Sequence, residues 1–189
     1  DTTLAVSATD TIFTGIMDTT DYFVGDNDVR IFKADMQAVC DSLLYNKRDS
    51  VFTLHQLPFV WCDSSQIAGD TIHILMKDKK VDKLTVTSGA TILNSEDLVF
   101  FNQIRGRYLE ALFEESKIYR MDVNGDAQIV YYMTDDAKAY IGVNTTEASN
   151  MTFLLSENKI TDIKNYGEPK SKVLPMKKTD HETIKVKGF

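Results

Sequence analysis

Residues 67–93 repeat without a gap at residues 104–130, an offset of 37 positions from Ile67 to Ile104. Internal repetition on this scale restricts a chain to architectures in which similar small units stack on one another. Ten positions keep the same residue or residue class in both copies. In the first copy they are Ile67, Gly69, Ile72, Met76, Lys80, Val81, Leu84, Val86, Ala90 and Ile92.

A third copy follows from Ala148, at a further offset of 42 positions from Leu109 to Met151. Its five extra residues are expected in the polar link around Asp135 to Lys138. A fainter copy precedes the others, from Met36 to Trp61.

Each copy has the pattern of a strand, a short polar connection and a return strand. The connections are residues 77–80, 114–117 and 156–159, and four residues is a common length for a hairpin loop. β-branched and aromatic residues alternate with polar ones through the copies, which is typical of half-buried strands. Helix-like spacing is confined to Ala34–Tyr45, where a strand fits equally well.

These observations predict an all-β fold of antiparallel hairpin repeats. A single hairpin of this size cannot bury its apolar face alone, so the copies must stack or roll up on each other.

The alternation also predicts which side chains face inward, because residues two apart lie on one face of a strand. In the second copy this alternation also places Ala111 on the inner face. The return strand of the third copy has Ile163 on this face, followed by the polar Asn165. The candidate inner-face residues are Ile72, Ile74, Met76, Leu84, Val86, Leu109, Phe113, Met121, Val123, Met151, Phe153 and Leu155. Such an interior is either a packed core or an open apolar groove, and the pattern leaves both possible.

Charge and motifs exclude several classes of function. The formal net charge is −7, which removes the basic footprint of a nucleic-acid-binding protein. No run approaches the roughly 18 apolar residues of a membrane-spanning helix. The sequence contains no HExxH, CxxC, GxSxG, GxxxxGK[ST] or GxGxxG motif, so catalysis could rest only on its plentiful carboxylates, which are usually a solvated surface.

Several segments resemble the OstA-like proteins of Bacteroidetes, relatives of the LptA-like lipopolysaccharide-transport proteins. The most specific are VCDSLLYNKRDSVF, FNQIRGR, VNGDAQIVYY and IGVNTTEASNM, within residues 30–174. The opening DTTLAVSATDTIF resembles the end of a preceding unit, so the chain is expected to be a carboxy-terminal portion of a longer protein.

The resemblance implies an elongated β-jelly-roll with an apolar trough that shields lipid A acyl chains. It further implies a periplasmic location with possible outer-membrane association, and no enzyme activity or cofactor. The implied partners are lipopolysaccharide or lipid A and other transport components or a second copy, joined through sheet edges. Basic residues for lipid A phosphates are not concentrated in this chain, which departs from that expectation. The implied division is 1–30 as the end of a preceding repeat, 31–176 as the jelly-roll repeats and 177–189 as a polar tail or linker.

Four smaller features each have two interpretations. Cys40 and Cys62 could form a disulfide in an oxidising compartment. The segment Asp122–Asp126 suggests either a calcium loop or a tight turn between strands, and lacks the later EF-hand ligands. Trp61 fits an interior anchor or a lipid-contacting lip. Arg105 and Arg107 fit a phosphate contact or a solvated edge.

The leading functional hypothesis is therefore a non-enzymatic lipid-binding or bridging module. A protein-interaction scaffold with a closed core is the second. A carbohydrate-active β-solenoid is the third, since Glu110, Glu114 and Glu115 could supply paired carboxylates on one copy.

Overall fold

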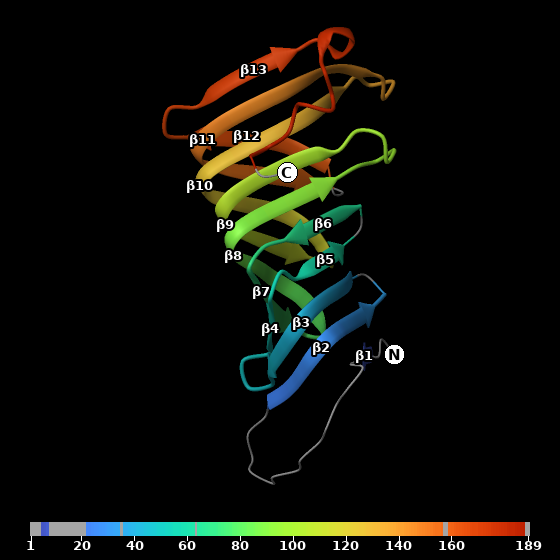
Figure 1. The fold of residues 1–189 in the computed structure, drawn as a ribbon, viewed down its shortest axis with the longest axis vertical. Helices are drawn as coiled ribbons and strands as arrows, with labels where there is room; N and C mark the ends of the chain where they lie inside the picture. The colour runs from blue at the N-terminus through green and yellow to red at the C-terminus, as the bar shows by residue number, and fades with distance from the viewer. Residues whose placement is uncertain (1–4, 8–21, 35, 63, 157–158, 188–189) are drawn as a thin grey trace.

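The computed structural model describes residues 5–7, 22–34, 36–62, 64–156 and 159–187, and it is built from one antiparallel sheet of 13 strands (Figure 1). This confirms the all-β prediction. The helix-like stretch 34–45 lies largely in a strand, and a short 3-10 turn follows the last strand at Met176–Lys178. The strands are β1 (Ala5–Ser7), β2 (Tyr22–Lys33), β3 (Met36–Asn46), β4 (Val51–His55), β5 (Phe59–Cys62), β6 (Ser65–Ala68), β7 (Thr71–Lys77), β8 (Lys80–Asn94), β9 (Asn102–Glu114), β10 (Lys117–Thr134), β11 (Tyr140–Ser156), β12 (Lys159–Tyr166) and β13 (Lys170–Leu174).

The sheet is folded over on itself along a line that crosses every long strand. β4 and β5 both pair with β3, β7 and β6 both pair with β8, and β12 and β13 both pair with β11. β4 and β5 are therefore the two halves of one bent strand, and the same holds for β6 with β7 and for β12 with β13. We call the side that contains β4, β7 and β12 the first arm, and the side that contains β5, β6 and β13 the second arm. The strands β2, β3 and β8 to β11 run through both.

Pairs of adjacent residues with positive φ mark the bend. Such backbone is costly for residues other than glycine, yet it recurs at the same level on every second strand of the sheet. The pairs are Asn27–Asp28, Gln56–Leu57, Ser88–Gly89, Gly125–Asp126 and Gly167–Glu168. We call this line the corner. The Asp122–Asp126 segment accordingly forms a corner inside β10, so the prediction of a turn between two strands is wrong.

The hairpins predicted at 77–80 and 114–117 are confirmed, with tighter loops than expected. Lys77 pairs with Lys80, and Glu114 pairs with Lys117. Only two residues remain in each loop, and both have positive φ, as in the hairpin turns that match strand twist. The third loop, 157–158, lies outside the described residues, but Ser156 and Lys159 pair on either side of it.

The five extra residues of the third copy were expected in the polar link at 135–138. The structure does not place them there. The strands are longer by seven residues, since β10 has 18 residues against 15 in β8 and β11 has 17 against 13 in β9. The link 135–139 is two residues shorter than the link 95–101, which leaves the net difference of five. The added length widens the second arm at this level.

Residues 176–187 cover this wider part of the second arm from outside. We call this segment the strap. Val186 is buried with Val130 and Val143, and Ile184 packs against the same cluster. Gln103 and Gln128 side chains accept the Val186 and Lys187 amides at 3.1 and 3.0 Å. The segment expected as a polar tail thus lies on the sheet as far as Lys187.

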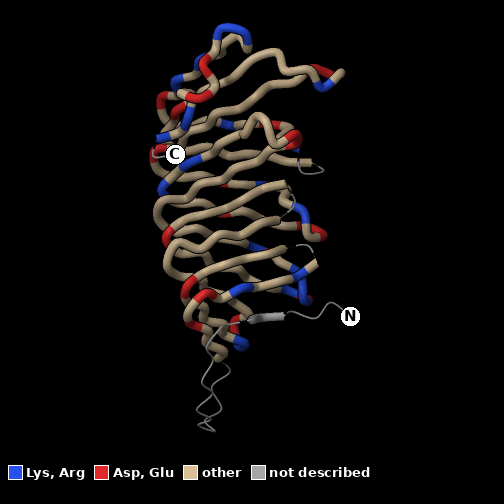
Figure 2. The backbone as a smooth tube through the Cα atoms, turned by 45° about the vertical axis from the view of Figure 1, so that its right-hand side comes forward, with Lys and Arg blue, Asp and Glu red and all other residues tan. Residues whose placement is uncertain are grey.

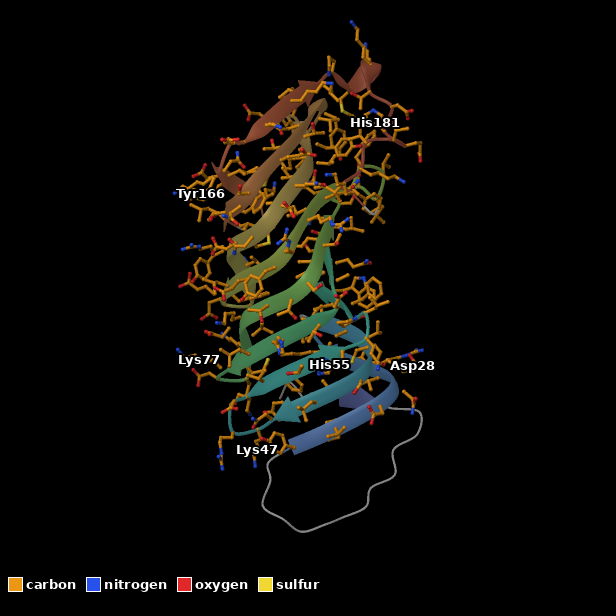
Figure 3. The ribbon with its side chains drawn as sticks, turned by 60° about the vertical axis from the view of Figure 1, so that its left-hand side comes forward. Asp28, Lys47, His55, Lys77, Tyr166 and His181 are labelled. Atoms are coloured by element: carbon orange, nitrogen blue, oxygen red, sulfur yellow. The ribbon has the colours of Figure 1, made fainter. Side chains whose placement is uncertain are left out.

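The two arms end opposite the corner in two rows of turns (Figure 2). The first-arm row contains 47–50, 78–79 and 115–116, and the second-arm row contains 95–101 and 135–139. We call the gap between the two rows the mouth. Figure 3 labels Lys47, in the first of the first-arm turns, and Lys77, next to the second, along one side of the molecule.

Candidate lipid-binding interior

All twelve candidate residues lie in the interior between the two arms. Ten are buried, and Met76 and Leu155 are partly buried against the same apolar cluster. Cross-strand neighbours continue the series from unit to unit: Ile74 pairs with Leu84, Leu84 with Ala111, and Met121 with Phe153. The copies therefore build one apolar interior along the stack, as the strand phase predicts.

The interior extends beyond the three clear copies. Val29, Ile31 and Leu43 on β2 and β3, and Leu54 on β4, belong to the same cluster. The fainter copy at 36–61 and the strand before it thus contribute the same face, although their sequences align poorly.

Side chains from the two arms fill this interior closely. At the mouth a cavity of about 10 Å³ is lined by Met36, Cys62, Val81, Leu84, Phe113 and Ser116. That volume is at the lower limit for one water molecule. In this conformation the interior is a packed core, and an acyl chain needs the arms to part.

The mouth is closed mainly by apolar side chains rather than by sheet hydrogen bonds. Phe113 and Ile118 are each 9% exposed at the first-arm edge, and Met76 and Leu155 are only partly covered. Side-chain contacts between two sheet edges separate without breaking backbone pairing. The strands within each arm stay hydrogen-bonded to their neighbours if the mouth widens.

Two of the three acidic residues considered for carbohydrate chemistry are paired with cations on the first arm. Glu110 pairs with Lys83 at 3.5 Å, and Glu115 pairs with Lys80, which lowers the pKa of the Glu115 carboxyl. Asp122, opposite Glu110 on the sheet, is held by Arg120 at 2.8 Å. These partners are typical of a structural, solvated face.

Cys40 and Cys62 are buried on the inner face of the second arm but form no disulfide. The β3–β5 register sets Trp61 opposite Gln37, so Cys62 lies level with Met36, four residues from Cys40. Four strand residues span roughly 13 Å, well beyond the 7 Å limit for a bridge. Burial raises the pKa of the Cys40 thiol to about 11. The alternative of a Cys40–Cys62 bridge is wrong.

Trp61 and the two arginines lie outside the interior. The Trp61 indole is on the outer face of the second arm, stacked 6.0 Å from Phe59 and donating to Gln66 at 3.0 Å. The interpretation of Trp61 as an interior anchor is therefore wrong. Arg105 and Arg107 line an open groove of about 860 Å³ along the corner, where Arg107 pairs with Asp126 at 2.6 Å.

Sequence reasoning missed the loop 95–101 on the second-arm row. Asp97 Oδ1 accepts the Val99 and Phe100 amides at 2.9 and 3.1 Å, and Tyr140 donates to Asp97 Oδ2 at 2.7 Å. These bonds lower the pKa of the Asp97 carboxyl to about 2. The Ser95 hydroxyl closes the other side of the loop, donating to the Phe100 carbonyl and accepting from the Leu98 amide. A Ser-x-Asp spacing ahead of an apolar run was the available signal.

The strands at the two ends of the sheet are exposed in different ways, one end through its side chains and the other through its backbone edge. β12 and β13 carry mainly exposed side chains on the last strands of the described stack. β2 pairs with β1 over Arg30–Phe32 only, so much of its outer edge has no strand partner among the described residues. Unpaired edge groups are templates for adding another strand.

The described residues contain neither a metal-binding cluster nor a membrane-spanning helix. No group of three or more His, Cys, Asp or Glu side chains there could hold a metal ion. No described helix is long and apolar enough to cross a membrane.

Comparison with known proteins supports the fold. No family model and no curated protein sequence matches the chain. Among solved structures, the chain is similar to LptH of Pseudomonas aeruginosa, described as the LptA-homologous periplasmic component of the lipopolysaccharide transport device. The TM-score is 0.51 at 12% sequence identity, over 74% of this chain and 93% of LptH. The fold is thus LptA-like, as the resemblance implied.

Proposed function

We propose that this chain is a non-enzymatic module that holds the acyl chains of a lipopolysaccharide-type lipid between its two arms. The observation that supports the proposal is the continuous apolar interior, from β2 to β12, behind a mouth closed mainly by apolar side chains. The solved structure with a similar fold is a component of lipopolysaccharide transport. We further propose a periplasmic location for this chain and membership in the OstA-like group.

Transfer along a bridge requires one interior to continue into the next. The exposed strands at both ends of the stack offer backbone groups for such a junction. We propose that the chain pairs through these edges with other transport components, with a second copy, or with the rest of a longer parent protein.

The closed interior favours a second candidate, a scaffold that binds only protein and whose core never opens. In that case the twelve inner-face residues act solely as a core. The two candidates differ in whether lipid enters, and that difference can be measured.

The experiment compares the unmodified protein with Phe113→Arg and Glu114→Arg, two adjacent substitutions on opposite sides of β9. Phe113 lines the mouth cavity, whereas Glu114 is exposed at the turn. Binding of fluorescent lipopolysaccharide and thermal unfolding are measured for all three. We expect binding by the unmodified protein and by Glu114→Arg, and sharply weaker binding by Phe113→Arg.

Because Phe113 is packed here, its replacement also costs stability, on the order of 2–4 kcal/mol. Binding is therefore compared at a temperature where Phe113→Arg remains folded. Absence of lipopolysaccharide binding by the unmodified protein, together with destabilisation of Phe113→Arg, would reject the carrier in favour of the scaffold.

A further inference from the structure

The loop 95–101 holds two aliphatic side chains out into solvent. Leu98 is 78% exposed and Val99 is 66% exposed. Leu98 has φ of 60°, a conformation that a bulky residue adopts only when its surroundings enforce it. We call Leu98 and Val99 the tip.

Hydrogen bonds fix the tip in this position from both sides. Ser95 accepts the Leu98 amide at 2.8 Å, and Asp97 accepts the Val99 amide at 2.9 Å. Phe100 is turned back against the outer face of the second arm, stacked on Tyr132 in the cluster beneath the strap with ring centroids 4.9 Å apart. The loop is therefore built to expose its two aliphatic residues while anchoring the next one.

Aromatic side chains lie behind the tip on the same arm. Phe101 follows it in the chain and is 38% exposed. Trp61 and Phe59 lie on the outer face of β5, which pairs with β6, itself paired with β8 directly before the loop. An aliphatic tip with aromatic rings behind it matches the layers of a bilayer interface, where aromatics lie at headgroup depth.

Both rows of turns beside the mouth carry charged residues. The first-arm row carries charged residues at Lys47, Arg48 and Asp49, at Asp78 and Lys79, and at Glu115. The second-arm row carries Glu96, Asp97, Asp135, Asp136 and Lys138 together with the apolar tip. Among the described turns of the two rows, the large exposed aliphatic side chains are those of the tip.

From these observations we infer that the tip inserts into the interface of a phospholipid bilayer and sets the mouth against it. A convex tip needs no complementary pocket, whereas a protein partner would have to supply one. A second copy joined through the terminal strands leaves the tip uncovered, because the loop joins β8 to β9 in the middle of the stack. The inference rests on the proposed function, because facing the mouth toward a bilayer is useful only if the interior takes up lipid.

The test is flotation of the protein with phosphatidylcholine vesicles. The tip variant carries Leu98→Ser and Val99→Ser together. The matched control is Leu57→Ser, because Leu57 is also a leucine with positive φ and 71% exposure but lies at the corner, opposite the mouth. We expect the unmodified protein and Leu57→Ser to float with the vesicles, and the vesicle-bound fraction of the tip variant to fall about tenfold or more.

Insertion is checked separately with a single tryptophan at the tip, in the variant Trp61→Phe with Leu98→Trp. Its fluorescence should be quenched by phosphatidylcholine brominated on the acyl chains. No flotation of the unmodified protein, equal flotation of the tip variant, equal loss in Leu57→Ser, or no quenching would each overturn the inference.

Failure of membrane insertion by the tip can be told apart from failure of lipopolysaccharide binding by the interior. Phe113→Arg alters the interior and leaves the tip unchanged, so it should still float with vesicles while losing lipopolysaccharide. If lipopolysaccharide binding is absent but tip-dependent flotation persists, the proposed function fails and the membrane contact stands.

Discussion

Gly106 lies so close to Val123 that a Cβ atom on the glycine would come within 2.4 Å of Val123 Cγ1. One unit earlier in the chain, Gly69 lies in the same way against Val86, at 2.1 Å. The repeated glycine at this level thus makes room for a valine of the next strand beside the corner. The third copy has Ala148 at the corresponding place.

Gly106→Ala should therefore destabilise the protein by about 1–3 kcal/mol through overpacking. Val123→Ala removes the obstructing methyl groups, so the double variant should lose less stability than the two single variants together. Chemical denaturation of the three variants measures the coupling. Strictly additive losses would show that the Gly106–Val123 contact does not limit packing.

The loop 95–101 should respond to acid at an unusually low pH. Asp97 accepts hydrogen bonds from the Val99 amide, Tyr140 and the Phe100 amide, and its pKa is lowered to about 2 from an ordinary value near 3.8. A carboxyl with a lowered pKa stabilises the fold above its unfolded pKa, and this contribution is lost as pH falls through the folded value. The loop should therefore stay formed at pH 4 and loosen between about pH 4 and 2.

The Val99 amide resonance, followed by NMR during acid titration, reports this transition directly. We expect a midpoint near pH 2 and no such transition in Asp97→Asn. A midpoint close to 4 in the unmodified protein would mean that the amide bonds to Asp97 do not persist in solution.

The strap should detach without unfolding the interior. Val186 is 4% exposed among Val130, Val143 and Tyr132, a cluster separate from the main core. Val186→Asp buries an unpaired charge there, so we expect the strap to detach and become susceptible to trypsin cleavage at its lysines. Lys187→Asp, one residue further along, is the control.

Far-ultraviolet circular dichroism should remain that of a β protein in Val186→Asp, because the strap contributes no strand. Cooperative loss of all β signal would instead make the strap part of the folding unit. Equal protease sensitivity in Lys187→Asp would remove the assigned role of the Val186 contact.

Both cysteine thiols should remain titratable after oxidative treatment and unfolding. The register separates Cys40 from Cys62, and the Cys40 pKa of about 11 keeps that thiol protonated near neutral pH. Thiol counting in denaturant should give two per chain. A count near zero in monomeric protein would contradict the β3–β5 register.

The sequence pattern was sufficient to predict the repeats, the hairpins and the inner face, because strand alternation directly reports which side is buried. The corner escaped prediction because residues such as Gln56 and Leu57 adopt positive φ without any glycine to signal it. The tip was hidden in an apolar run, Leu98 to Phe101, that has the composition of a strand. Its conformation depends on hydrogen bonds among Ser95, Asp97 and Tyr140. Tyr140 is distant in sequence, so this contact forms only in the folded structure.

Whether the interior is packed or open could not be read from alternation, because both states require the same apolar face. Phe113 satisfies either one: it points inward at the edge of the mouth and meets Met36 and Cys62 from the other arm. The gap between the arms is set by the corner, and the corner was the part that the pattern did not reveal.

Site-specific cross-linking tests the central claim, that acyl chains enter between the arms, most directly. Leu155 and Leu154 are adjacent on β11 and partly exposed, but Leu155 packs against the inner cluster whereas Leu154 pairs with Arg120 and Asp162 on the outer face. Benzoylphenylalanine is placed at each position in turn, and the protein is irradiated with lipopolysaccharide. We expect a lipopolysaccharide adduct at position 155 and none at 154; equal adducts at both positions, or an adduct at 154 alone, would contradict binding in the interior.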